Sequence, residues 1–328
     1  MKELQPFVGE ILSGYVFRLA LWCEEFPLAP SCVNDLYCQS FVSSSLDPDY
    51  DSTGKFSKIS IEALRAVWPG ANFSSLFAPV NSFVLPRFYR RSYCYSCLCD
   101  QIERSWSPTI LRQWGLLYYG VCELHEVSLF DAPFNAKVRI NLAHDFFCFH
   151  CENNTNVTAG ILSKMGSESI LKVQCFIESL HSSIEASTIN ASLLEFCCLS
   201  LKIFLYPQYG ICNNYNARKE IPLRSPFWQR SHLGVFIATV PERQSAILLL
   251  GWVLGIYNLE LELLPNHISA VIAHENQNTW WLGAAASHLP DNIYRHSILM
   301  LRCLEANIAL PSVKQFIDGF SSRFAKRT

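Results

Sequence analysis

Two short stretches, Cys94-Tyr-Ser-Cys97 and Cys122-Glu-Leu-His125, place four metal-ligand residue types in pairs along the chain. In each pair the ligands stand three positions apart, so that one tight turn can present both of them to the same ion. Three thiolates and one imidazole fill the four positions of tetrahedral Zn²⁺ and leave none for water. The spacing therefore predicts a structural zinc site made of Cys94, Cys97, Cys122 and His125.

Other cysteines complicate this prediction. Cys99 lies two residues past Cys97 and is an alternative ligand, but the CxxC spacing favours Cys97. Chance also produces close pairs in a chain with 14 cysteines, as the adjacent Cys197 and Cys198 show. A second pair at a fitting distance argues against chance for the first site.

A third cluster lies further along the chain, where His144, Cys148, His150 and Cys151 follow one another closely. His144, Cys148 and Cys151 are the candidate ligands of a second metal ion. No further pair completes a closed site, and a lone carboxylate such as Asp131 is more often a solvated loop residue or a cap. The sequence leaves a second zinc ion open.

Charge places a limit on nucleic-acid binding. The 328 residues carry 26 Lys plus Arg against 28 Asp plus Glu, a formal net charge of -2, so that any contact with nucleic acid must be local. Basic residues interleaved with aromatic residues flank the predicted zinc site, and such a set can hold phosphates and stack on bases. These candidate contacts are Arg87, Arg90, Arg91, Arg104, Arg112, Lys137 and Arg139.

A more ordinary role for these cations is equally compatible with the sequence. They can simply solvate the outside of a small metal module, or pair with Glu103, Glu123 and Glu126. The faces on which the cations lie decide between the two interpretations.

Apolar periodicity predicts helices in the first part of the chain. Apolar residues recur at helical spacing through 8–23 and 59–68, on either side of a turn-rich stretch that includes Pro27 and Pro30. The regular period is then lost, except around 111–119. We expect a small helical unit followed by a metal-organised segment.

Helical periodicity returns in the second half, at 161–180, 193–205, 246–264 and 293–309. The chain, 50% hydrophobic, is long enough for a large core. We therefore expect a mainly α fold with three parts: an N-terminal helical domain over 1–86, a zinc-finger module over 87–158 and a larger C-terminal helical domain over 159–328.

The N-terminal residues are not expected to form an export signal, because Glu3, Glu10 and Arg18 interrupt the early apolar run. The thiols are then expected to stay reduced, as in the cytoplasm. The apolar stretch 246–257 is shorter than the ~20 residues that span a bilayer, and it predicts a buried helix.

The middle of the chain resembles the central signature of the TniQ family of transposition target-selection proteins: Cys94-x-x-Cys97-Leu98-x-Asp100, then Trp114, then Cys122-x-x-His125-x-x-x-Leu129. The N-terminal run is similar to the opening helix of the family: Glu10-Ile-Leu-Ser13-Gly-Tyr-Val-Phe-Arg18-Leu19-Ala20. Together the matches cover roughly residues 6–151.

One departure from the family pattern follows the first finger. Family members commonly carry another CxxC there, before a final CxxC. In this chain Asp131-Ala-Pro-Phe-Asn135 stands in that place, while Cys148 and Cys151 match the final pair. This departure puts the second zinc in doubt.

The resemblance implies a bacterial, cytoplasmic, non-catalytic adaptor of DNA transposition, with a helix-turn-helix-like N-terminal domain. Such proteins choose the target site in CRISPR-associated transposons. They bridge an RNA-guided Cascade complex to the AAA+ regulator TnsC, which calls the transposase. The implied partners are Cascade with its guide RNA, a TnsC-like AAA+ ATPase, target DNA and a second copy of the chain in a homodimer, with no membrane.

Two alternatives remain beside the bridging adaptor. Longer relatives of the TnsD kind bind an attachment-site DNA directly through extra C-terminal modules, for which 328 residues and a net charge of -2 leave little room. A generic zinc-containing interaction protein would also carry such a finger, but not the N-terminal match.

An enzyme is not expected. GxxxxGK[ST], GxSxG and HExxH are all absent from the sequence. Asp47, Asp49 and Asp51 lie in a proline-containing segment without a supporting scaffold, and a solvated loop is the better interpretation.

Overall fold

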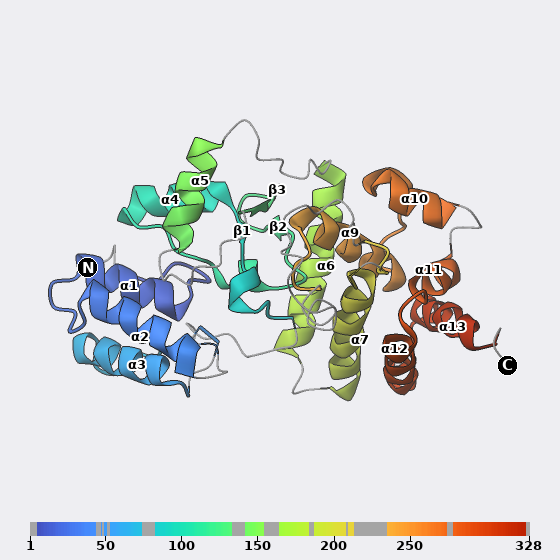
Figure 1. The fold of residues 1–328 in the computed structure, drawn as a ribbon, viewed down its shortest axis with the longest axis horizontal. Helices are drawn as coiled ribbons and strands as arrows, with labels where there is room; N and C mark the ends of the chain where they lie inside the picture. Colours follow the sequence, from blue (N-terminus) through green and yellow to red (C-terminus); the bar gives the residue numbers. More distant parts are fainter. Residues whose placement is uncertain are drawn as a thin grey trace. The chain divides into compact units, whose positions relative to one another are not determined.

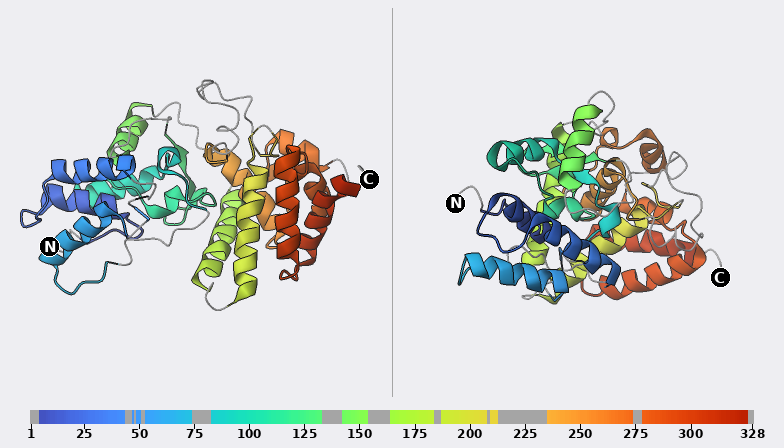
Figure 2. Two further views of the ribbon diagram at one scale, coloured as in Figure 1. Left: turned by 60° about the horizontal axis from the view of Figure 1, so that its bottom comes forward. Right: turned by 60° about the vertical axis from the view of Figure 1, so that its left-hand side comes forward.

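Helices dominate the computed structural model, which confirms the mainly α fold class. The structure describes residues 5–43, 47, 49–50, 53–73, 83–132, 142–153, 164–183, 187–207, 209–212, 235–273 and 278–325. Two compact units make up the fold (Figures 1 and 2): Met1–Leu116 with Leu129–Ala159, and Leu117–Ser128 with Gly160–Thr328. The three-part division at residues 86 and 158 stays a prediction.

Three helices pack together at the start of the first unit: α1 (Leu12–Trp22), α2 (Pro30–Ser43) and α3 (Lys55–Val67). Their apolar side chains meet in one buried cluster, because residues three and four positions apart share a helix face. This cluster includes Leu12, Tyr15, Val16, Leu19, Val33, Tyr37, Phe56 and Leu64. The helices expected over 8–23 and 59–68 are thus confirmed as α1 and α3.

Helix α2 corrects the expected turn-rich stretch. The sequence predicts a turn at Pro30, but this residue is the first of α2, where its missing N–H costs no hydrogen bond and its fixed φ suits the helix. Val33 and Tyr37, one turn apart, are fully buried against α1 and α3. Packing against α1 and α3 therefore stabilises a helix that the weak apolar periodicity of this stretch did not predict.

Glu10 and Arg18, both from the N-terminal motif, form an ion pair inside the first unit. The Nη2 atom of Arg18 lies 2.7 Å from Oε2 of Glu10, and both side chains are buried. Glu10 also accepts a hydrogen bond from the backbone N–H of Phe7 at 2.9 Å. The pair ties the residues that precede α1 to the body of the helix.

The rest of the first unit contains two more helices than the sequence indicated. Its elements are η3 (Arg87–Tyr89), β1 (Ser92–Tyr93), α4 (Tyr95–Ser105), η4 (Arg112–Gly115), β4 (Phe130–Asp131) and α5 (Leu142–Glu152). Strands β1 and β4 pair antiparallel, with Tyr93 opposite Phe130. The helical period expected around 111–119 amounts only to the short 3-10 turn η4.

The second unit is a bundle of helices joined to one small hairpin. Its elements are β2 (Val121–Cys122), β3 (Val127–Ser128), α6 (Lys164–Ser182), α7 (Thr188–Phe204), α9 (Val240–Val253), η7 (Leu261–Leu263), α10 (Asn266–Ala273), α11 (Thr279–Ala286), α12 (Asp291–Glu305) and α13 (Pro311–Ala325). Helices α6, α7, α12 and α13 stand side by side in sequence order (Figure 2). The periodic stretches in the second half correspond to α6, α7, α9 and α12.

Helix α9 is the buried helix that the apolar stretch 246–257 predicted, although it ends at Val253. Residues 246–250 are almost completely enclosed. Among the described residues, the structure has no helix that is both long and apolar enough to cross a membrane.

Helices α11 and α13 cross at two glycines, Gly283 and Gly319. A Cβ atom on Gly319 would lie 2.9 Å from Cα of Trp280 and closer still to the Trp280 carbonyl oxygen. A Cβ atom on Gly283 would meet the backbone of Phe316 and Phe320 in the same way. The two backbones can approach this closely only because neither glycine has a side chain.

We expect Gly319→Ala to lower the free energy of unfolding by about 2 kcal/mol, because the added methyl forces the α11 and α13 backbones apart. Urea denaturation followed by circular dichroism measures this change. Lys314→Ala, at an exposed position of the same helix, is the control and should change stability by less than about 0.5 kcal/mol. Equal stability of both variants would contradict the close crossing.

Candidate metal centre

The first pair of predicted ligands lies at the start of α4. Cys94 is the N-cap residue, with extended backbone angles of φ -103° and ψ 118°. Cys97 lies in the first helical turn, and the backbone N–H of Leu98 closes that turn onto the Cys94 carbonyl oxygen at 3.2 Å. The helix start therefore directs both thiols, which are buried, to one side of the turn.

The second pair lies in the tight turn between β2 and β3. Cys122 ends β2 and pairs with Val127, the first residue of β3. The N–H of Glu126 donates to the Cys122 carbonyl oxygen at 2.7 Å, and Glu126 takes a left-handed φ of 54° to complete the turn. This geometry folds His125 back toward Cys122.

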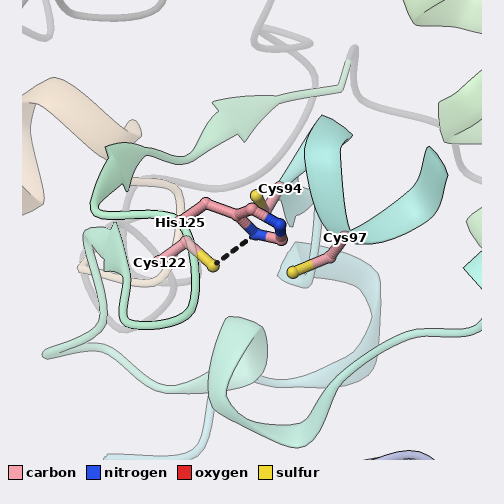
Figure 3. A group of neighbouring side chains, drawn as sticks. All are labelled: Cys94, Cys97, Cys122 and His125. Atoms are coloured by element: carbon pink, nitrogen blue, oxygen red, sulfur yellow. Dashed lines mark hydrogen bonds between the residues drawn. The ribbon is translucent and has the colours of Figure 1, made fainter. Parts of the chain in front are cut away.

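The four predicted ligands converge, as Figure 3 shows. The ligand atoms of Cys94, Cys97, Cys122 and His125 all lie within 4.8 Å of one another. Sγ of Cys122 is 3.6 Å from Nδ1 of His125. Zinc bonds of about 2.3 Å to sulfur and about 2.05 Å to nitrogen, at the tetrahedral angle, separate such a pair by about 3.6 Å. The group can hold a metal ion.

The donor set at this group is closed. The three cysteines are buried and His125 is half-buried. Glu123 lies in the same turn, and burial raises the pKa of its carboxyl group, with the neighbouring Cys122 adding to the rise. Four protein ligands leave no coordination position for a substrate or a reacting water, which is the arrangement of structural metal sites.

Two buried glutamines, which no motif in the sequence indicates, hold the hairpin that carries Cys122 and His125. Gln174, on α6, accepts hydrogen bonds from the N–H groups of Gly120 and Val121. Gln244, on α9, donates to the Gly120 carbonyl oxygen and to Ser128. A glutamine within an apolar helix face is a weak signal, and neither lies near the hairpin in sequence.

The candidate second site is not assembled in the same way. His144 and Cys148 are one turn apart on α5, with Nδ1 and Sγ separated by 3.6 Å. Sγ of Cys151 instead lies 3.8 Å from the hydroxyl of Tyr95. Within the part of the chain that the structure describes, Cys94, Cys97, Cys122 and His125 are the single group of three or more such ligands. A second zinc, and any role of Cys99, stay predictions.

His150, the remaining member of that cluster, is packed among aromatic rings. It is buried, its Nδ1 atom lies 3.2 Å from the hydroxyl of Tyr93, and its ring stacks on Tyr95 with centroids 3.8 Å apart. Phe130 meets it edge-on at 4.7 Å. Burial lowers the pKa of His150. The residue joins α5 to β1 and β4 by packing.

Two of the seven candidate nucleic-acid contacts, Arg87 and Arg90, lie inside the first unit. Both side chains are buried and pair with carboxylates. Nη1 of Arg87 lies 3.4 Å from Oδ2 of Asp49, and Nη1 of Arg90 lies 3.8 Å from the same atom. Arg90 also forms a close ion pair with Asp47. Neither guanidinium is available to phosphate.

The carboxylates correct the expectation of a solvated loop. Asp49 is fully buried, and its side chain accepts hydrogen bonds from the Tyr37 hydroxyl at 2.9 Å and the Ser13 N–H at 3.3 Å. Asp47 is partly exposed beside Arg90. Asp47 and Asp49 therefore belong to an ion-pair and hydrogen-bond network that joins α1, α2 and η3. Asp51 lies outside the described residues.

The other candidate contacts are divided. Arg91 is half-buried, 3.9 Å from Asp131, and Arg112 is also half-buried. Arg104 is exposed near the end of α4. Trp106 follows it at 80% exposure and adopts a left-handed φ of 57° as the C-cap of α4. Lys137 and Arg139 lie outside the described residues.

No family model, curated protein or solved structure matches this chain. The likeness to the TniQ signature therefore rests on the residues quoted above.

We expect Asp49→Asn to lower the free energy of unfolding by about 3 kcal/mol, because it leaves the buried guanidiniums of Arg87 and Arg90 without their shared carboxylate. Urea denaturation measures the loss. Asp35→Asn, at an exposed position of α2, is the matched control and should be nearly neutral. A neutral Asp49→Asn variant would show that the network does not support the fold.

Proposed function

We propose that this chain is a zinc-stabilised, non-catalytic adaptor of the TniQ type, which selects the target site in DNA transposition. The observation that carries the proposal is the convergence of Cys94, Cys97, Cys122 and His125. These are the residues on which the resemblance to the family signature depends. Their closed arrangement fits a structural role in a protein that performs no strand chemistry.

Zinc is the ion that suits this donor set. Thiolate sulfur and imidazole nitrogen are softer ligands than the oxygens that Mg²⁺ and Ca²⁺ require. When bound, a structural zinc ion supplies folding free energy and no reaction step. Cys94 and Cys97 would hold it from the start of α4, and Cys122 and His125 from the hairpin.

The N-terminal motif adds support of a different kind. Glu10 and Arg18, which the motif sets eight residues apart, form a buried ion pair at 2.7 Å. A buried, bidentate pair restricts both positions to these residue types, because loss of either partner leaves an uncompensated charge. The resemblance thus includes residues with a clear structural task.

The bridging role is the better supported of the two forms of target selection. Direct recognition of an attachment-site DNA needs a basic surface, and burial withdraws Arg87 and Arg90 from that surface. We therefore propose that the chain, in a bacterial cytoplasm, connects Cascade with its guide RNA to a TnsC-like AAA+ ATPase on target DNA, as a homodimer.

Replacement of a metal ligand tests the zinc site. We expect the purified wild-type protein to contain about one zinc ion per chain, and Cys122→Ser to contain much less and to melt at lower temperature, because one of the four ligands is gone. Elemental analysis and thermal denaturation measure the two effects. Cys303→Ser removes an exposed thiol of α12 and should behave as wild type.

A zinc-free wild-type protein of full stability would contradict the structural metal site. If zinc is present, transposition assays should show that Cys122→Ser reduces targeting in proportion to its loss of folded protein. Loss of targeting from a fully folded variant would instead indicate a direct role for the ligand.

Affinity purification tests the adaptor role. The tagged chain, co-expressed with the CRISPR effector and guide RNA of its element, should recover Cascade and guide RNA in stoichiometric amounts. The same expression without guide RNA is the control. Recovery of the chain alone, with the effector well expressed, would refute the bridging role and favour direct recognition of an attachment-site DNA.

A further inference from the structure

We propose that Gln174 and Gln244 are positioning residues of the metal centre, which set the place of Cys122 and His125 without touching the ion. This inference rests on the proposed metal-binding function. It adds two side chains, on the helices α6 and α9, to the four candidate ligands of the centre.

Gln174 fixes the strand that leads into Cys122. Its side chain is fully buried on α6. Oε1 accepts from the N–H groups of Gly120 at 2.9 Å and Val121 at 3.0 Å, and Nε2 donates to the Val121 carbonyl oxygen at 3.0 Å. The amide of Gln174 thereby makes the hydrogen bonds that a neighbouring strand would make to Gly120 and Val121, directly before Cys122.

Gln244 joins both ends of the hairpin. It lies on α9 with only 2% of its surface exposed. Its Nε2 atom donates to the Gly120 carbonyl oxygen at 2.8 Å and to Oγ of Ser128 at 2.8 Å. Because Gly120 precedes Cys122 and Ser128 follows His125, this single amide holds the two ends of the ligand-bearing turn together.

The approach between the hairpin and α9 is close enough to require a glycine. A Cβ atom on Gly120 would lie 2.8 Å from Cγ of Gln244 and 3.4 Å from Cδ1 of Ile247. A side chain at position 120 would force the Gln244 side chain to shift. The hairpin is therefore seated on the helix along its backbone.

The hairpin needs this support, since β2 and β3 contain two residues each and isolated two-stranded hairpins are marginal in water. Without the glutamine amides, the buried N–H groups of Gly120 and Val121 would lose their partners, a penalty that favours rearrangement of the segment. A displaced segment moves both ligands it carries, and metal sites tolerate only small displacements.

Titration of the full chain with Co²⁺ tests the inference, because cobalt–thiolate absorption bands report both affinity and ligand geometry. Gln174→Met removes every hydrogen bond at nearly constant volume, and we expect Co²⁺ affinity to fall about tenfold or more, as for other residues that orient metal ligands. Gln174→Glu keeps the acceptor but loses the donor to Val121, and its affinity should lie between those of Gln174→Met and wild type.

Thr279→Val is the matched control. Thr279 is buried in α11, and its hydroxyl donates to the Ser312 carbonyl oxygen at 2.8 Å, away from the hairpin. The variant also removes a buried hydrogen bond from the second unit, but we expect its Co²⁺ affinity and spectrum to match those of wild type. Far-ultraviolet circular dichroism confirms that each variant keeps its helices.

The outcomes separate the two proposals. A wild-type chain that binds no Co²⁺ overturns the metal centre and this inference with it. Wild-type binding together with unchanged affinity and spectrum in both Gln174 variants overturns the positioning role alone. If Gln174→Met does not fold, Gln174→Glu decides, and an affinity equal to that of wild type refutes the inference. An equal loss in Thr279→Val also refutes it, because the effect would then be general destabilisation.

Discussion

Four ligands can share one ion only if two turns, distant in sequence, present their side chains to the same point. This constraint governs the middle of the chain. Helix α4 begins directly after Cys94, and Glu126 takes a left-handed conformation that returns His125 toward Cys122, so both turns meet this requirement. The hairpin of two-residue strands is seated on Gln174 and Gln244, since so small an element cannot hold a position by itself.

Local patterns singled out the four residues that converge, because CxxC and CxxH turns are complete within four residues. They also predicted the amphipathic helices, whose burial repeats every turn. What escaped prediction depends on partners far along the chain. Pro30 begins a helix only because the residues that follow it pack on α1 and α3. Asp49 meets Arg87 across 38 positions, and no local signal distinguishes such a carboxylate from a solvated one.

Buried ion pairs enclose several of the charged residues of the first unit. With 16% of residues charged, a chain is expected to place nearly all of them in water, yet several full charges lie inside the first unit. Glu10 with Arg18, and Asp49 with Arg87, neutralise each other there. The count of charged residues therefore overstates how many of these charges meet solvent in the first unit.

Trp106 ends α4 in an unfavourable backbone conformation. Glycine is the residue that most easily takes the left-handed conformation at a helix end, and a bulky side chain there costs of order 1 kcal/mol. The tryptophan has no compensating burial, since 80% of its surface is exposed. A glycine at this turn would avoid that cost, so the end of α4 combines an unfavourable backbone conformation with a large apolar surface in contact with solvent.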